Sequence, residues 1–306
     1  MFCKEAENIL AKKVLFRGIG TAIITPFTEG EIDFNTFGRL IDEAVAHADA
    51  LIVAGTTGEA PTLTEKERDA LLSFALARTE GRIPVIMGTG SNDTAHAVTL
   101  ARRACDMGAD GVLVVTPYYN RGTREGIKKH FLHIAEASDS PVILYNVPAR
   151  TGSTLTLADY EALLPHPNIL GVKEAEENTE KFFLLCEEFG KEKQIYTGSD
   201  AFLLSAMALG GAGVISVASN AFPEKLKRIF CAFEEGDTAL SRRLFGEILP
   251  LIRLLFTETS PAPIKEALRV LGYGNGECRL PLTPPTPLLC ARLHAEIFRL
   301  TSTPLS

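Results

Sequence analysis

ILGVKEA, residues Ile169–Ala175, has the composition of a buried strand and yet carries a lysine, Lys173, in its interior. Four apolar or glycine residues precede Lys173, and an ammonium group is costly to bury without a partner. Two interpretations follow. In the first, Lys173 lies at a strand end and its side chain extends to solvent. In the second, burial keeps the amine neutral, so that it can attack a carbonyl carbon and form a Schiff base.

Seven further apolar runs are similar to this strand, and helical segments separate them. They are Gly18–Phe27, Ala50–Glu59, Pro84–Gly90, Gly111–Asn120, Pro141–Gly152, Gln194–Asp200 and Gly213–Asn220. Strands that are buried on both faces and joined by helical crossovers form parallel sheets. Eight such units predict an α/β protein with a closed (β/α)8 TIM barrel. An open doubly wound sheet is the alternative, but no GxGxxG motif follows the first strand.

Two helix starts are marked by capping residues. Asp33 is expected to cap a helix that runs to about Ala48, and Thr64 with Glu67 forms a capping box for a helix through Arg78.

The strand pattern stops near Asp237. Three helical stretches follow, and they are Ala239–Phe256, Pro263–Leu271 and Leu288–Leu300. We therefore expect a barrel over residues 14–236 and a C-terminal helical appendage over residues 237–306. A separate helical domain is the alternative, but it would have little core of its own. Another helix is expected before the barrel, through Lys13.

The composition argues against several classes of function. The 306 residues carry a formal net charge of -7 and contain no run rich in Lys and Arg, which argues against binding to nucleic acid or to a membrane surface. The six cysteines show no CxxC or other metal spacing and are predicted to be reduced thiols. His130 and His133 have no acidic or thiol ligand in the same helical turn, so a solvated helix face is expected and no metal site is predicted.

Two features bear on where the protein is found. The N-terminal segment MFCKEAENILAKK has acidic residues and no apolar core of signal-peptide length, which predicts a cytoplasmic protein. The uncharged run Ala201–Pro223 is interrupted by Gly210, Gly211 and Gly213. It is expected to form a short helix, a turn and a buried strand rather than a membrane span.

Polar side chains gather where the predicted strands end, which is where a (β/α)8 barrel places its functional residues. Tyr145 and Lys173 end neighbouring strands, and together they suggest an amine nucleophile with a phenol proton donor beside it. The threonines at other strand ends have a simpler explanation, because their hydroxyls can cap the following helix.

Two further features indicate a ligand with carboxylate groups. GTTGE (Gly55–Glu59) places two hydroxyls and several backbone N–H groups in a turn before a helix, an arrangement that suits a carboxylate. Arg150 follows the strand of Tyr145 and can bind a second carboxylate through two parallel N–H groups. The predicted ligands are keto acids.

Six motifs occur in an order and spacing that carry a family resemblance. They are GTTGE (Gly55–Glu59), TPYYN (Thr116–Asn120), YNVPARTG (Tyr145–Gly152), GVKEA (Gly171–Ala175), TGSD (Thr197–Asp200) and GVISV (Gly213–Val217). Together they resemble the 4-hydroxy-tetrahydrodipicolinate synthases, formerly called dihydrodipicolinate synthases. The resemblance extends from about Gly18 to the C-terminal helices and implies the barrel fold.

The resemblance implies roles for four catalytic residues. Lys173 matches the lysine that forms a Schiff base with pyruvate, and Tyr145 matches the tyrosine that relays protons to and from the bound intermediates. Thr56 matches the hydroxyl that links this tyrosine to a second one. Tyr119 matches that second tyrosine, which in the family enters the site of a neighbouring subunit. Self-association as a dimer or a dimer of dimers, a homotetramer, is therefore expected.

Three more residues match substrate-binding positions of the family. Thr57 matches the residue that holds the pyruvate carboxylate, and Arg150 the one that receives the carboxylate of aspartate 4-semialdehyde. Ile215 matches a residue whose backbone carbonyl lies near pyruvate. The implied reaction condenses pyruvate with L-aspartate 4-semialdehyde to 4-hydroxy-tetrahydrodipicolinate, the first committed step of the diaminopimelate and lysine pathway. It needs no cofactor, because the protonated imine serves as the electron sink.

Two alternative functions remain open. A sister enzyme of the same Schiff-base superfamily, such as N-acetylneuraminate lyase or a 2-keto-3-deoxy sugar acid aldolase, would keep Lys173 and Tyr145. Arg150 and the paired threonines favour the synthase, because the second substrates of the sugar-acid relatives present hydroxyls or a neutral aldehyde there. A non-catalytic keto-acid-binding barrel would not need the lysine, tyrosine and threonine set.

The resemblance also predicts that L-lysine inhibits weakly or not at all. In inhibited relatives lysine occupies a cleft at the dimer interface, where its ammonium groups need anionic or carbonyl partners. This chain keeps Asn92 and Tyr118 of that cleft but has His96 where inhibited bacterial enzymes place a glutamate. Glu65 and Arg68 stand where those enzymes have histidines, and Glu65 would compensate only if its side chain points inward.

Overall fold

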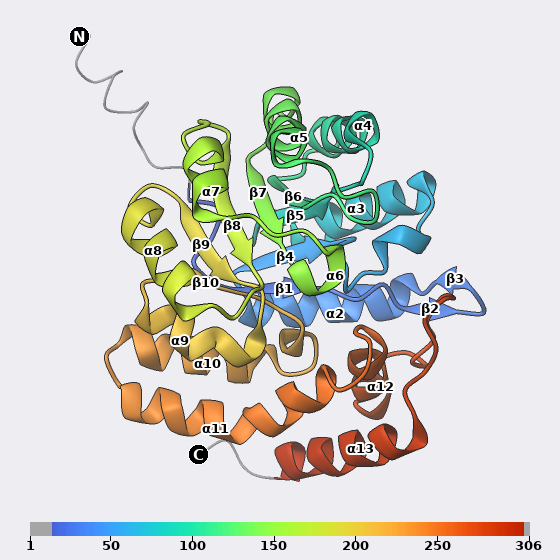
Figure 1. The fold of residues 1–306 in the computed structure, drawn as a ribbon. Coiled ribbons are helices and arrows are strands. Elements are labelled where there is room, and N and C mark those ends of the chain that lie inside the picture. The colour runs from blue at the N-terminus through green and yellow to red at the C-terminus, as the bar shows by residue number, and fades with distance from the viewer. Residues whose placement is uncertain (1–13, 303–306) are drawn as a thin grey trace, which may run out of the picture.

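A closed barrel of eight parallel strands forms the centre of the molecule, as the apolar runs predicted (Figure 1). The computed structural model describes residues 14–302, so the helix expected through Lys13 lies outside the described residues. Each strand pairs with the next one along the chain, and β10 closes the barrel against β1. The barrel strands are β1 (Gly18–Ala22), β4 (Ala50–Val53), β5 (Val85–Gly88), β6 (Gly111–Val115), β7 (Val142–Asn146), β8 (Ile169–Glu174), β9 (Gln194–Thr197) and β10 (Gly213–Ser216).

A helix follows every barrel strand, so each unit has the predicted strand–helix order. These helices are α2 (Phe34–His47), α3 (Glu65–Thr79), α4 (Thr94–Asp106), α5 (Arg124–Ala137), α7 (Leu157–Leu163), α8 (Thr179–Phe189), α9 (Leu203–Ala208) and α10 (Pro223–Glu234). The Asp33 side chain caps α2 by accepting from the Thr36 N–H, and Thr64 forms the predicted capping box with Glu67. Both predicted helix starts are confirmed.

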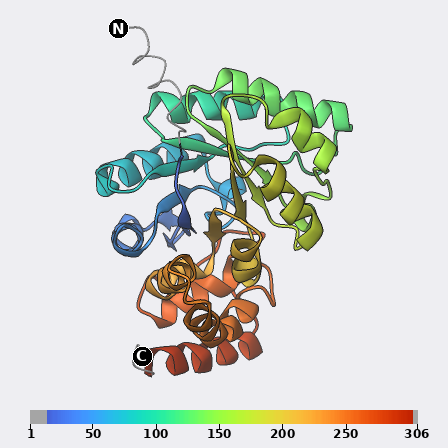
Figure 2. The ribbon, with the colours of Figure 1, turned by 90° about the vertical axis from the view of Figure 1, so that its left-hand side faces the viewer.

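Three helices follow the barrel and share its core. They are α11 (Thr238–Leu255), α12 (Ala262–Val270) and α13 (Pro287–Ser302), which match the three predicted stretches. Figure 2 shows them, in orange and red, gathered on the side of the barrel away from the green helices. Leu244, Ile248 and Leu251 of α11 belong to the same buried cluster as the outward-facing barrel residues. The appendage therefore completes the hydrophobic core.

Several short elements were not predicted. A two-stranded hairpin, β2 (Phe27–Thr28) and β3 (Glu31–Ile32), lies between β1 and α2. Short helices follow β4, β7, β9 and β10, and they are η1 (Ala60–Thr62), α6 (Pro148–Thr151), η2 (Asp200–Phe202) and η3 (Ala218–Asn220). All four lie in the segments that follow barrel strands, at the end where the polar residues were expected.

The uncharged run Ala201–Pro223 is divided among η2, α9, β10 and η3, as its glycines predicted. Within residues 14–302, no helix combines the length and the apolar character that crossing a membrane requires.

The expectation of a solvated histidine pair is wrong for His130. Its side chain is 3% exposed, and one ring nitrogen bonds the Thr94 hydroxyl at 2.9 Å. His133 on the same helix is exposed, as expected. The period of α5 explains the difference, because His130 shares the inner face with Ile127, Phe131 and Ile134, and His133 does not.

Candidate active site

A cavity of about 210 Å3 opens at the carboxyl ends of the strands. Its walls come from the segments that carry GTTGE, TPYYN and YNVPARTG. Thr56, Tyr118, Tyr145 and Arg150 line it, together with Arg68 of α3. Residues that are far apart in sequence therefore meet where a (β/α)8 barrel places its active site.

Lys173 and Tyr145 lie side by side on β8 and β7. They are register partners, each side chain is 6% exposed, and Lys173 Nζ lies 4.2 Å from the centroid of the Tyr145 ring. The interpretation in which Lys173 extends to solvent is therefore wrong. A buried amine beside a phenol is the arrangement that Schiff-base chemistry requires, because the amine attacks and the phenol transfers protons.

The TGSD and GVISV segments shape the space around Lys173. A Cβ atom at Gly198 would lie 3.0 Å from Lys173 Cε, so glycine leaves room for the lysine chain. The Asp200 carboxylate is fully buried and accepts hydrogen bonds from the Ser216 hydroxyl and from the N–H groups of Val217 (2.9 Å) and Ala218 (3.3 Å). Burial raises the pKa of Asp200, and the hydrogen bonds from Ser216, Val217 and Ala218 oppose that rise.

The GTTGE turn is strained at both ends and anchored from outside the barrel. Ala54 and Glu59 adopt left-handed backbone conformations, with φ values of 49° and 54°. Thr57 is 5% exposed, and the neighbouring Thr56 lines the cavity. The Glu59 carboxylate forms a buried ion pair with Lys265 of α12, which holds the turn against the C-terminal appendage.

Arg150 and Ile215 occupy different depths of the site. Arg150 is exposed at the mouth, on α6, and its guanidinium donates to the Ser260 carbonyl at 3.1 Å. Ile215 of β10 is fully buried in the barrel interior, in the cluster that contains Tyr145. Of the seven expected residues, Thr56, Tyr145 and Arg150 line the cavity and Lys173 lies beside Tyr145, while Thr57 is buried next to Thr56 and Ile215 is buried in the barrel interior.

Tyr119 is the exception. Its side chain is 90% exposed, its φ is 69°, and it does not line the cavity, whereas the preceding Tyr118 does. Within one subunit this ring is exposed and outside the cavity lining.

Two groups of residues near the cavity were given no catalytic or substrate-binding role from the sequence. Arg68 lines the cavity, donating to the carbonyls of Gly88 (3.0 Å) and Ala60 (2.7 Å), and burial lowers the pKa of its guanidinium. Asn146 and Glu174 lie one residue beyond Tyr145 and Lys173, on the outer side of the barrel wall. The alternation of side chains along a strand could have placed them there, because neighbours in a strand face opposite sides.

Comparisons with known proteins agree with this geometry. The model of the dihydrodipicolinate synthetase family matches residues 15–296. The 4-hydroxy-tetrahydrodipicolinate synthase of Alkaliphilus oremlandii is 47% identical over 271 residues, which cover 88% of this chain and 93% of the relative. Dihydrodipicolinate synthase from Aquifex aeolicus superposes with a TM-score of 0.90 at 40% identity, covering 95% of this chain and 100% of that one.

A third similar protein was solved with a ligand. It is the chloride-inhibited dihydrodipicolinate synthase from Acinetobacter baumannii complexed with pyruvate, with a TM-score of 0.91 and 34% identity over 95% of this chain and 100% of that one. The family model and the curated relative each span most of the sequence, and the barrel, the buried lysine and its neighbouring tyrosine fit them. The chain therefore belongs to the dihydrodipicolinate synthetase family.

Proposed function

We propose that this protein condenses pyruvate with L-aspartate 4-semialdehyde to give 4-hydroxy-tetrahydrodipicolinate, the first committed step of diaminopimelate and lysine biosynthesis. The observation that carries the proposal is the buried amine of Lys173 beside the Tyr145 ring, at a cavity that Thr56 and Arg150 line. The named relatives support the choice of substrates.

The reaction follows from the placement of these groups. The Lys173 amine attacks the keto carbon of pyruvate, and loss of water gives an imine. Removal of a methyl proton gives an enamine, whose carbon attacks the aldehyde carbon of the semialdehyde. The amino group of the semialdehyde then attacks the imine carbon, closes the ring and releases the lysine. Tyr145 relays the protons, and no cofactor takes part.

Substrate carboxylates account for the remaining residues. Thr57, in the turn anchored by Glu59, holds the pyruvate carboxylate, and the Ile215 carbonyl lies near the bound pyruvate. Arg150 at the mouth receives the carboxylate of the semialdehyde, a charge-assisted contact that a neutral aldehyde substrate would not make. Arg150 thus favours the synthase over the sugar-acid lyases.

Borohydride reduction in the presence of pyruvate tests the assignment of the nucleophile. We expect a stable adduct on Lys173 in the wild-type enzyme and none in Lys173→Ala, as measured by mass spectrometry of peptides. Lys193→Ala is a matched control, because Lys193 is a partly buried lysine whose Nζ bonds carbonyls at the amino end of β8. An adduct on another lysine would refute the assignment. A coupled assay with both substrates, run beside N-acetylneuraminate cleavage, separates the synthase from its sister enzymes.

We infer further that the enzyme works as a dimer or a dimer of dimers, with Tyr119 acting in a neighbouring subunit. The support is the exposure of this ring and its position outside its own cavity. Mixing inactive Tyr119→Phe and Lys173→Ala subunits should restore part of the activity, because one mixed site then has both residues. No recovery, once mass spectrometry shows that subunits have exchanged, would contradict the inference.

The organisation of the chain and its compartment are part of the proposal. We divide the chain into a catalytic barrel, residues 14–236, and a helical appendage, residues 237–306, because all described strands precede α11. A cytoplasmic enzyme is supported by the free thiols of the described cysteines, Cys105, Cys186, Cys231, Cys278 and Cys290.

A further inference from the structure

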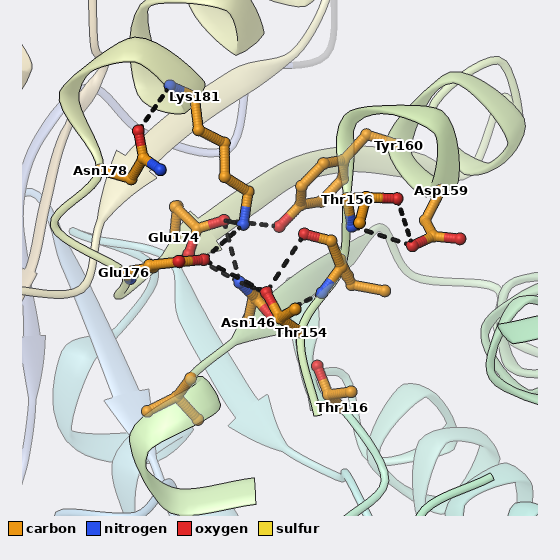
Figure 3. A network of polar contacts seen from close by, with 12 residues as sticks. Thr116, Asn146, Thr154, Thr156, Asp159, Tyr160, Glu174, Glu176, Asn178 and Lys181 are labelled. Carbon is orange, nitrogen blue, oxygen red and sulfur yellow. Dashed lines mark hydrogen bonds and ion pairs between the residues drawn. The ribbon is translucent and has the colours of Figure 1, made fainter. Parts of the chain in front are cut away.

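A second pair of register partners lies one residue beyond Tyr145 and Lys173. Asn146 of β7 and Glu174 of β8 face the helix layer, and both are buried, at 0% and 1% exposure. Asn146 Nδ2 donates to Glu174 Oε1 at 2.8 Å and to Oε2 at 3.0 Å. This contact joins the two strands through side chains (Figure 3). It lies one register position beyond the two residues that carry the proposed chemistry.

The Glu174 carboxylate is held from several sides. It accepts from the Tyr160 hydroxyl of α7 at 2.8 Å and from the Glu176 N–H at 2.9 Å, and it pairs with Lys181 Nζ of α8 at 2.9 Å. Figure 3 shows the Lys181 chain and the Tyr160 ring converging on it. A carboxylate with this many partners has little freedom to rotate, so the end of β8 is fixed to two helices.

Asn146 connects the same network to the segment that carries Arg150. Its Oδ1 accepts from the Leu155 N–H at 3.0 Å, and its Nδ2 lies 3.4 Å from the Thr154 hydroxyl. Leu155 and Thr154 follow α6, the short helix of Arg150. One amide side chain thus links the ends of β7 and β8 with the loop at the mouth of the cavity.

The backbone ladder also joins these strand ends, since Tyr145 pairs with Lys173 and Asn146 with Glu174, and its one register shift, between Val142 and Ile143, lies near the beginning of the strands. The side-chain network adds contacts to α7, to α8 and to Leu155 that the ladder does not make. A displacement of about 1 Å at reacting groups can lower a rate by on the order of a hundredfold. Residues that fix the strands behind the reacting side chains therefore affect the rate, because they hold the reacting groups in place.

We propose that Asn146 and Glu174 are positioning residues, which set the relation between the Lys173 amine and the Tyr145 phenol through the carboxyl ends of β7 and β8. The proposal rests on the proposed function, because it concerns the groups that act in that reaction. It assigns no contact with substrate to Asn146 or Glu174. Its expected signature is a slower imine and a lower kcat, with a much smaller change in the KM for pyruvate.

Asn146→Ala tests the proposal, with Asn168→Ala as the matched control. Asn168 Nδ2 donates to the carbonyls of Ala135 (3.1 Å), Ser138 (2.7 Å) and Ser140 (3.1 Å), at the opposite, amino end of the same two strands. Both variants should lower the melting temperature. Only Asn146→Ala should slow borohydride-trappable adduct formation and kcat, by on the order of tenfold or more.

A nearly isosteric variant, Asn146→Asp, tests the same role without removing side-chain atoms from the core. Asn146→Asp sets a second carboxylate against Glu174, with Lys181, Tyr160 and Glu176 as the other ionisable groups around the pair. Uptake of one shared proton would restore the contact, so its adduct rate relative to the wild type should rise as pH falls from about 8 to about 6. Wild-type rates in Asn146→Ala, or a relative rate for Asn146→Asp that does not change with pH, would overturn the positioning role. Absence of an adduct in the wild-type enzyme would overturn the proposed function and the positioning role with it.

Discussion

At the scale of single residues, His130 shows how burial fixes a protonation state. Burial lowers the pKa of His130 to about 4, with the nearby His133 lowering it further and Asp93 opposing. The native protein therefore keeps a neutral imidazole at pH values where an unfolded chain, with an ordinary histidine pKa of about 6.5, takes up a proton. Stability from this residue is complete above about pH 6.5 and is lost as pH falls towards about 4.

This difference predicts a pH-dependent free energy of unfolding. Between pH 7 and pH 5 the wild-type protein should lose about 2 kcal/mol that a His130→Gln variant does not lose, because glutamine cannot take up the proton. Denaturant titrations at the two pH values measure it. His133→Gln, on the exposed face of the same helix, serves as the control and should keep most of the wild-type pH dependence, because burial is the larger cause of the His130 shift. An equal pH dependence in His130→Gln would contradict the prediction.

At the scale of elements, a buried ion pair connects the GTTGE turn to α12. The side chains of Lys265 and Glu59 are almost completely buried, Lys265 Nζ lies 4.3 Å from the centroid of the Phe27 ring, and it donates to the Glu277 carbonyl at 2.8 Å. Burial lowers the pKa of Lys265, and the Glu59 carboxylate opposes that fall. The turn that is proposed to hold pyruvate thus depends on the appendage.

Lys265→Met should lower the free energy of unfolding by about 3 to 5 kcal/mol, because it leaves the Glu59 carboxylate buried without its cation. Denaturant unfolding measures this change. The double variant Glu59→Gln/Lys265→Met should recover most of the loss, since no charge then remains unpaired. A single variant as stable as the wild type would show that the ion pair does not hold the turn.

Elements that depend on local pattern were predictable, and long-range contacts were not. Asp33 and Thr64 mark helix starts through bonds to residues three positions away, so their patterns are visible in the sequence. The pairing of Lys265 with Glu59 joins positions some two hundred residues apart, and no local pattern indicates it. For the same reason His130 was misassigned, because the burial of a helix face depends on what packs against it.

At the scale of the whole molecule, the closed barrel explains why strand ends indicated where the candidate site lies. Parallel strands put all their carboxyl ends on one face, so Thr56, Tyr145 and Lys173 had to meet once the strands were identified. Tyr119 was assigned by resemblance alone, and a single chain leaves it exposed. The role of Tyr119 depends on how copies of the chain associate. No local pattern in the sequence indicates that association.

Weak inhibition by L-lysine is the last expectation, and it concerns the cleft of Asn92 and Tyr118 that the resemblance places at the dimer interface. The Glu65 carboxylate pairs with Arg103 at 3.0 Å and its side chain is 53% exposed, so it is not turned inward as a partner for an ammonium group. Arg68 adds a buried positive charge to the wall that Tyr118 also lines. His96, where inhibited bacterial relatives are expected to have a glutamate, is exposed on α4.

Within one subunit, neither Glu65 nor His96 is therefore expected to give a lysine ammonium an anionic partner. The missing charge-assisted contact corresponds to about 1.5 to 3 kcal/mol, or roughly a tenfold to hundredfold weaker affinity. We expect half-inhibition only at millimolar L-lysine or above in the coupled assay, and stronger inhibition of His96→Glu, which restores an anionic partner, than of a His96→Gln control. Half-inhibition of the wild-type enzyme well below a millimolar would contradict this expectation. It would mean that the bound lysine has an anionic partner other than Glu65 or a residue at position 96.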